Sequence, residues 1–216
     1  MKKYLIFISI LILTSCKKNN NDSNNNCFNT VVDNSSIQLV SSQDFDTIKY
    51  LFQKNNLSYK NLQFYHYVKD DITMIKTRQA LCYQYVNNLK VFLYGLMFEF
   101  TDNDSLRLIS GHKITNINLR STPIMDKNQV RDIYIKAING DSLLTGFLSI
   151  KDTVIKECLK VEFGYYDLNA GHGDTANNFT TAWKINPDNN DFPYAYIDDS
   201  NGKLILYFDG IIINKK

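Results

Sequence analysis

The stretch 166–178, with the sequence YDLNAGHGDTANN, places an imidazole and a carboxylate close together on glycine-rich backbone. Gly171 and Gly173 flank His172, and Asp174 follows. Two alternatives fit this composition: a loop that contacts a ligand or partner through His172 and Asp174, or a solvated connection between strands, which we favour. One histidine with one or two carboxylates is too small a ligand set for a metal, so we expect no metal site.

A pair of adjacent carboxylates, Asp198 and Asp199, precedes Asn201-Gly202. Asn-Gly between two apolar runs predicts a tight hairpin. The two aspartates could bind a cation beside this turn. Adjacent aspartates more often initiate a turn by accepting hydrogen bonds from nearby backbone, and we favour that role.

Thiol chemistry is limited by the number and spacing of the cysteines. The chain has four, at positions 16, 27, 82 and 158, and no Cys-x-x-Cys pair suggests a redox or zinc site. If Cys16 is modified as argued below, an odd number remains, so at least one free thiol or intermolecular link is expected. Cys82 and Cys158 both lie in predicted strands. We favour two separately buried thiols over a disulfide between them.

The N-terminal residues have the organisation of an export signal. Two lysines precede an apolar run over 5–13, which is too short to span a bilayer. The run ends in Leu13-Thr-Ser-Cys16, which resembles a bacterial lipobox. That resemblance implies a signal peptide over 1–15, lipid attached to Cys16, and anchorage to a lipid bilayer. Lys17 follows instead of Asp, so we expect the outer membrane of the cell envelope.

Residues 16–40 are predicted to be a lipidated cysteine followed by a disordered tether. Lys17 to Ser36 is almost entirely polar, with asparagine as its commonest residue. Such a segment has too little apolar surface to offset the entropy lost on ordering.

Composition excludes several function classes. The formal charge of the 216-residue chain is only +2, so it lacks the electrostatic footprint of a nucleic-acid-binding protein. We find no nucleophile–base spacing, phosphate loop or metal frame, and therefore expect neither enzymatic activity nor a cofactor. The 14 Tyr and 13 Phe favour β-sheet.

Two stretches have the apolar spacing of amphipathic helices. Ser41 and Asp44 have capping-box spacing and precede a predicted helix over 43–55. A second helix is predicted over 126–138, with Asp126 as its N-cap. Strands are predicted over 62–67, 73–86, 90–100, 106–118, 143–150, 154–165, 180–185, 194–197 and 203–213. Because a helix is twice followed by strands, we expect an α+β fold of two small units, each a helix packed on an antiparallel β-sheet.

The first unit, over 41–119, contains a recognisable hairpin. Residues 82–100, CYQYVNNLKVFLYGLMFEF, resemble the hairpin of the fungalysin/thermolysin propeptide (FTP) domain. Gln84, Leu89 and Val91 match that pattern, whereas Asn88 replaces the usual glycine of the turn. The resemblance makes Gln84 a candidate partner contact. Its alternative role, which we favour, is to hydrogen-bond backbone within the sheet.

The second unit, over 120–216, resembles a PepSY-type domain. Thr122-Pro123 before the predicted helix matches its opening, and the closing hairpin over 196–204 matches its end, with Asp199 where a small residue is usual. The strand Thr181-Ala-Trp183-Lys-Ile185 matches as well, so the resemblance makes Trp183 a second candidate partner contact. We favour a packing role in which the indole N–H finds a buried acceptor.

In thermolysin-like metallopeptidases these two domains form a propeptide that assists folding of the catalytic domain and keeps it inactive. The His-Glu-x-x-His frame of such a peptidase is not found in this sequence. The resemblance therefore implies a free-standing, propeptide-like lipoprotein that binds, inhibits or chaperones a secreted or envelope peptidase. The alternative is an envelope binding module for a peptide, a glycan or another envelope component.

Overall fold

In the computed structural model, residues 27–31, 35–70, 76–142, 154–171 and 176–210 are described. Within them the chain forms the helices α1 (Ser42–Lys54) and α2 (Lys127–Gly140), which confirms both predicted helices, and a short helical turn over 154–156. The described strands are β1 (Phe28–Thr30), β2 (Leu62–Asp70), β3 (Thr77–Val86), β4 (Leu89–Thr101), β5 (Leu106–Ser110), β6 (Leu159–Asp167), β7 (Phe179–Pro187), β8 (Tyr194–Asp198) and β9 (Leu204–Phe208).

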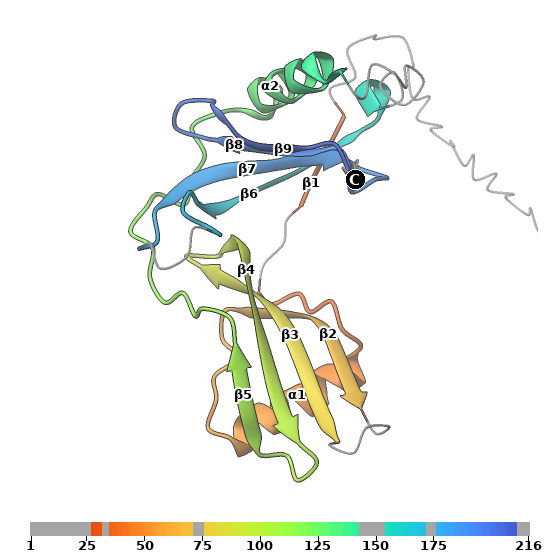
Figure 1. The fold of residues 1–216 in the computed structure, drawn as a ribbon, viewed down its shortest axis with the longest axis vertical. Coiled ribbons are helices and arrows are strands. Elements are labelled where there is room, and N and C mark those ends of the chain that lie inside the picture. Colours follow the sequence, from red (N-terminus) through yellow and green to blue (C-terminus); the bar gives the residue numbers. More distant parts are fainter. Residues whose placement is uncertain (1–26, 32–34, 71–75, 143–153, 172–175, 211–216) are drawn as a thin grey trace, which may run out of the picture.

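All nine strands belong to one sheet, in the order β2-β3-β4-β6-β7-β8-β9, with β5 beside β4 and β1 beside β6. The sheet is mixed, because β1 and β4 both pair with β6 in parallel while the other pairs are antiparallel. It curls strongly into a half-barrel (Figure 1). The predicted fold class, two units that each pack a helix on their own antiparallel sheet, is therefore wrong.

The parallel pairing of β4 with β6 explains the error. β4 is 13 residues long, and near its start Lys90 pairs with Tyr85 of β3 on one side. On the other side, Lys90 and Val91 pair with Gly164 and Tyr165 of β6. Alternation along a strand predicts which face each residue occupies, but it does not identify a partner strand far away in sequence. One sheet thus forms where the sequence suggested two.

The pairing of β4 with β6, here called the joint between the two halves, depends on close contact between their backbones. A Cβ atom at Gly164 would lie 2.6 Å from the carbonyl oxygen of Lys90 and 2.7 Å from the ring of Phe92, so only glycine fits. Beyond the paired residues, the Tyr94 hydroxyl on β4 donates to the carboxylate of Asp167 at the end of β6. Burial and this contact raise the pKa of Tyr94 to about 12.

The first half of the molecule comprises α1 and β2–β5. Ser41 caps α1 by accepting a 3.1 Å hydrogen bond from the Asp44 amide, as the capping-box spacing predicted. Phe52 is fully buried and contacts the rings of Phe64 and Phe98 on the sheet. Cys82 in the same core is a buried free thiol whose pKa burial raises to about 12, so the free thiol expected from the sequence is confirmed.

The second half comprises β1, α2 and β6–β9. Asp126 and Gln129 form a complete capping box at the start of α2. The buried face of α2 includes Tyr134, whose hydroxyl donates a 2.6 Å hydrogen bond to the Pro193 carbonyl oxygen. Both helices lie on the same side of the curled sheet, with α2 over β7 and β8 and α1 over β2–β4 (Figure 1).

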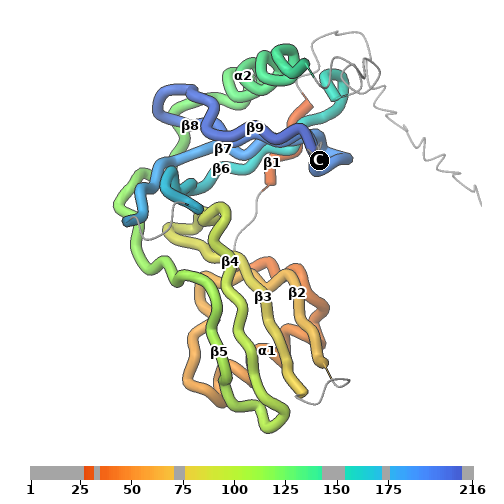
Figure 2. Tube along the Cα trace, in the orientation of Figure 1, coloured from red at the N-terminus to blue at the C-terminus, as the bar shows by residue number. Residues whose placement is uncertain are grey.

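Part of the segment predicted over 16–40 to be a disordered tether belongs to the fold. Phe28–Thr30 form β1, and Cys27 is disulfide-bonded to Cys158, which corrects the expectation that Cys158 is a free thiol. Figure 2 shows β1, from the beginning of the chain, beside the strands of the second half. Three residues within a polar segment carry too weak a pattern to predict a strand.

Two predicted strands are shorter in the structure. The strand predicted over 106–118 ends at Ser110, and residues 154–156 are helical, so the strand predicted from 154 begins only at Leu159. The strand predicted over 143–150 lies outside the described residues. Asn87 and Asn88 both have positive φ, 52° and 63°, which confirms the tight turn expected there.

Candidate binding surface

Two of the five residues singled out from the sequence can be placed in the fold. Cys16, His172 and Asp174 lie outside the described residues. Gln84 lies on β3 of the first half and Trp183 on β7 of the second. Both are buried, with 2% and 4% of their surface exposed.

Gln84 forms hydrogen bonds with the segment that follows β5 and connects the two halves. Its Nε2 donates a 2.8 Å hydrogen bond to the carbonyl oxygen of His112, and its Oε1 accepts a 2.9 Å bond from the amide of Ile114. The side-chain amide therefore holds the chain that leaves β5, which is the backbone-bonding role favoured from the sequence.

Trp183 packs in the core beneath α2 and donates from Nε1 to Asp199, at 2.9 Å. The Asp199 carboxylate is fully buried and also accepts bonds from Arg120, at 2.6 Å, and from the amides of Ile124 and Met125, each at 2.9 Å. Burial alone would raise the pKa of Asp199, but Arg120 and these amides outweigh it and lower the pKa. Asp199 thus organises the chain before α2.

Asp198 has the turn role predicted for it. Its carboxylate accepts a 2.7 Å bond from the Ser200 amide and a 3.1 Å bond from the Thr180 hydroxyl. The carboxylates of Asp198 and Asp199 thus both accept hydrogen bonds from donors within the chain. Among the described residues, no group of three or more His, Cys, Asp or Glu side chains is placed to hold a metal ion.

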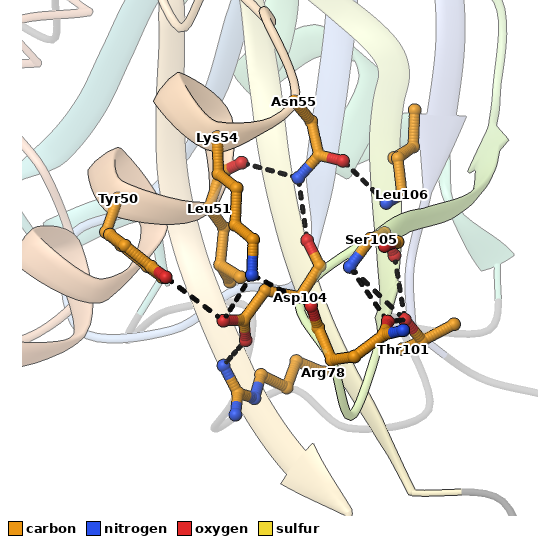
Figure 3. Close-up of polar contacts among 10 residues, drawn as sticks. Tyr50, Leu51, Lys54, Asn55, Arg78, Thr101, Asp104, Ser105 and Leu106 are labelled. Carbon is orange, nitrogen blue, oxygen red and sulfur yellow. Dashed lines mark hydrogen bonds and ion pairs between the residues drawn. The ribbon is translucent and has the colours of Figure 1, made fainter.

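A further ionic network ties α1 to the sheet of the first half (Figure 3). Asp104 accepts from Lys54 on α1, at 3.1 Å, and from Arg78 on β3, while the Tyr50 hydroxyl lies 3.3 Å away. Burial opposes ionisation of Asp104, but Lys54 and Arg78 reverse that effect and lower its pKa. Asn55 completes the network by bonding the backbone of Asp104 and Leu106, both at 2.8 Å. This cluster is structural.

The most distinctive surface is the face of the sheet that points away from both helices, here called the inner face. Cys82 packs under α1, so its neighbour Tyr83 points to the inner face, and Tyr196 points there because Ala195 and Ile197 pack under α2. The inner face is lined by Tyr65, Tyr83, Lys90, Phe92, Lys160, Glu162, Tyr166, Lys184, Phe192, Tyr194, Tyr196 and Phe208.

The buried floor of the inner face is aromatic. Tyr196 lies 5.2 Å from Phe92 and 4.8 Å from Tyr166, measured between ring centroids, and all three rings are buried. Since Phe92 lies on β4 and the two tyrosines on β6 and β8, these rings join strands of both halves. Burial raises the pKa of both tyrosines, so their hydroxyls stay protonated at neutral pH.

Partly accessible rings and ammonium groups lie around this floor. Tyr65 and Tyr83 stack with centroids 4.4 Å apart, and the ammonium group of Lys90 lies 3.7 Å from the centroid of Tyr83. At the other end, Tyr194 lies 5.7 Å from Phe192, which is 46% exposed. Flat rings and cations in one row form a surface suited to binding.

No family model matches this chain, and no curated protein matches it. Of the helices described, none combines the length and the apolar character that crossing a membrane requires.

The inner face was missed at the level of sequence because its residues come from seven strands. The alternation of side chains along the strands that contain Tyr83 and Tyr194-Ala-Tyr196 can be read from the sequence, and it assigns each residue to one face of its strand. What joins these strands into one surface is the β4–β6 pairing, for which the sequence carries no short-range signal.

Proposed function

We propose that this chain is a non-enzymatic binding module of the cell envelope, held at a membrane by lipid on Cys16. The single observation that carries the binding role is the inner face, where strands of both halves contribute one row of rings and lysines. Aromatic rings give large contact area with little entropy to lose, and lysines add charge recognition. The lipobox-like stretch ending at Cys16 supports the membrane attachment.

Attachment is tested by fractionating cells that express the full chain. The wild type should sediment with membranes, whereas Cys16→Ala should not carry lipid and should leave the membrane fraction. Cys82→Ala is the matched control, since its thiol is buried in the core and should not affect lipidation. Equal membrane retention of the Cys16 variant would contradict the anchor.

The binding role is tested by affinity capture with the mature chain carrying Cys16→Ser as bait. Tyr83→Ala and Tyr194→Ala should each abolish capture of the physiological partner. Lys49→Met, on α1 and therefore on the opposite side of the sheet from the inner face, should leave capture unchanged. A partner retained by both tyrosine variants would show that another surface does the binding.

A second candidate function, binding a secreted or envelope peptidase, is favoured by the edge of the sheet. Among the described strands, β9 is the last in the sheet order and pairs with β8 alone. A pocket of about 410 Å³ lies between β9 and α2, with Leu204 and Tyr207 in its lining. An extended segment of a partner could add to such an edge and place a side chain in the pocket.

This candidate also fits the resemblance to thermolysin-like propeptides. Adding the mature chain to thermolysin-like peptidases of the same cell should slow peptide cleavage or increase the yield of refolded enzyme. Lack of either effect on all of them would eliminate the peptidase while leaving the inner-face proposal intact.

A further inference from the structure

The centre of the inner face carries more positive than negative charge. Lys90 on β4, and Lys160 and Lys184 on β6 and β7, lie near the buried carboxylate of Glu162. The ammonium group of Lys90 lies 3.4 Å from Glu162 Oε1. Two carboxylates, Glu162 and Asp191, act on Lys184 and do not balance the three lysines, so this part of the surface has charge complementarity to an anion.

Lys184 is the lysine most affected by this crowding. Burial is the largest cause that lowers its pKa, and Lys90 and Lys160 lower it further. Glu162 and Asp191 act in the opposite direction without restoring the ordinary value. A carboxylate placed beside Lys184 would act on it in the same direction as Glu162 and favour its charged form.

Aromatic rings lie on both sides of the lysines. The stacked pair Tyr65 and Tyr83 lies toward β2, and Tyr194, Phe192 and Phe208 lie toward β9, with centroids 5.4 to 5.7 Å apart. From β2 to β8 the surface crosses five strand spacings of about 4.8 Å each, which amounts to roughly 24 Å along the curve. A chain ligand fits this length better than a single small molecule.

We propose that the inner face binds an acidic carbohydrate chain, whose carboxylates pair with the lysines while its sugar rings pack on the aromatic rings. This inference rests on the proposed binding function and names its ligand class. Sugar rings have apolar C–H faces that match flat aromatic surfaces, and carboxylates accept charge-assisted hydrogen bonds from ammonium groups. An acidic peptide would satisfy the lysines but offers no regular flat face for the rings, and a neutral glycan would leave Lys184 desolvated.

The experiment is calorimetric titration of the mature chain carrying Cys16→Ser with oligogalacturonate, a uronic acid polymer. Its methyl ester, which keeps the sugar rings and removes the charge, should bind at least about tenfold more weakly. Raising the salt concentration should weaken binding to oligogalacturonate and have little effect on the ester.

Variants locate the site. Lys184→Met and Tyr194→Ala should each weaken oligogalacturonate binding about tenfold, since each removes one charge-assisted or stacking contact. Lys49→Met on α1 should bind like the wild type. Thermal melting of Lys184→Met confirms that it folds, which we expect because methionine removes a partly buried charge.

Several outcomes would overturn the inference. Binding of polyglutamate or of a single-stranded oligonucleotide as tightly as oligogalacturonate would show a general anion surface, and failure of oligogalacturonate to bind would reject the carbohydrate. If either occurs while Tyr83→Ala and Tyr194→Ala still abolish capture of a cellular partner, only the ligand class is wrong. If these variants change nothing in either assay, the proposed binding function of the inner face fails as well.

Discussion

The two halves of the molecule are stabilised differently. The first half is continuous in sequence from α1 to β5, and its core of aromatic side chains is reinforced by the Asp104 network at the end of α1. The second half takes β1 from before the first half and is closed by the Cys27–Cys158 disulfide and the buried Asp199 carboxylate. A contiguous half folds on hydrophobic packing, whereas a half assembled from distant segments needs specific long-range links.

The largest effect should come from removing the buried carboxylate of the second half. Asp199→Ala leaves the donors of Trp183, Arg120 and two backbone amides without their acceptor, and should cost about 4 kcal/mol of unfolding free energy. Urea unfolding monitored by hydrogen exchange should show protection lost first in β6–β9.

Asp191→Ala, an exposed aspartate in the same half, is the control and should change stability little. If Asp199→Ala lowers protection equally in β2–β5, the two halves are not separately stabilised and the comparison fails.

Breaking the disulfide should come next. The double variant Cys27→Ala/Cys158→Ala should lose about 3 kcal/mol, because the cross-link constrains the unfolded chain across a long loop. We expect β1 to lose its exchange protection before any strand of the first half. As a control, reductant should destabilise the wild type to the same extent and leave the double variant unaffected.

The joint between the halves can be opened without changing either core. Gly164→Ala forces a Cβ to within 2.6 Å of a backbone oxygen of β4 and should cost about 2 kcal/mol. If the joint couples the halves, the variant should unfold in two separate transitions detected by exchange. Gly140→Ala, where an added Cβ meets nothing within 4 Å, should behave like the wild type.

The smallest effect concerns pH and the first half. The pKa of Asp104 is lowered in the folded state, so its contribution is complete above the ordinary value of 3.8 and is lost as pH falls through the lowered one. Asp104→Asn keeps the shape and tolerates the positive φ of 66°, and should cost about 1 kcal/mol at pH 7. That difference from the wild type should shrink below pH 3.8 in denaturant titrations; a constant difference would contradict the ionic role.

The same contrast explains what the sequence could predict. In the first half, the helix over 43–55 and the Asn87-Asn88 hairpin follow from local spacing and turn chemistry, and both were correct. In the second half, β1 and the partner of Cys158 depend on residues 131 positions apart, which no local pattern records.

The candidate residues named from the sequence show the same limit. Gln84 and Trp183 were identified by resemblance, and the structure places both inside the fold, each bonded to a neighbouring segment. The inner face was not predicted, because alternation assigns Tyr83 and Tyr196 to a face but cannot show that those faces join.

The covalent path set by the disulfide has a mechanical consequence. A pull on the chain before Cys27 passes through sulfur to Cys158 and continues from there along β6. The first half lies within the closed ring between these two cysteines and bears no tension. Reducing the bond would put that half directly in line with the load, so the redox state of this cysteine pair would decide which part of the molecule unfolds first under tension.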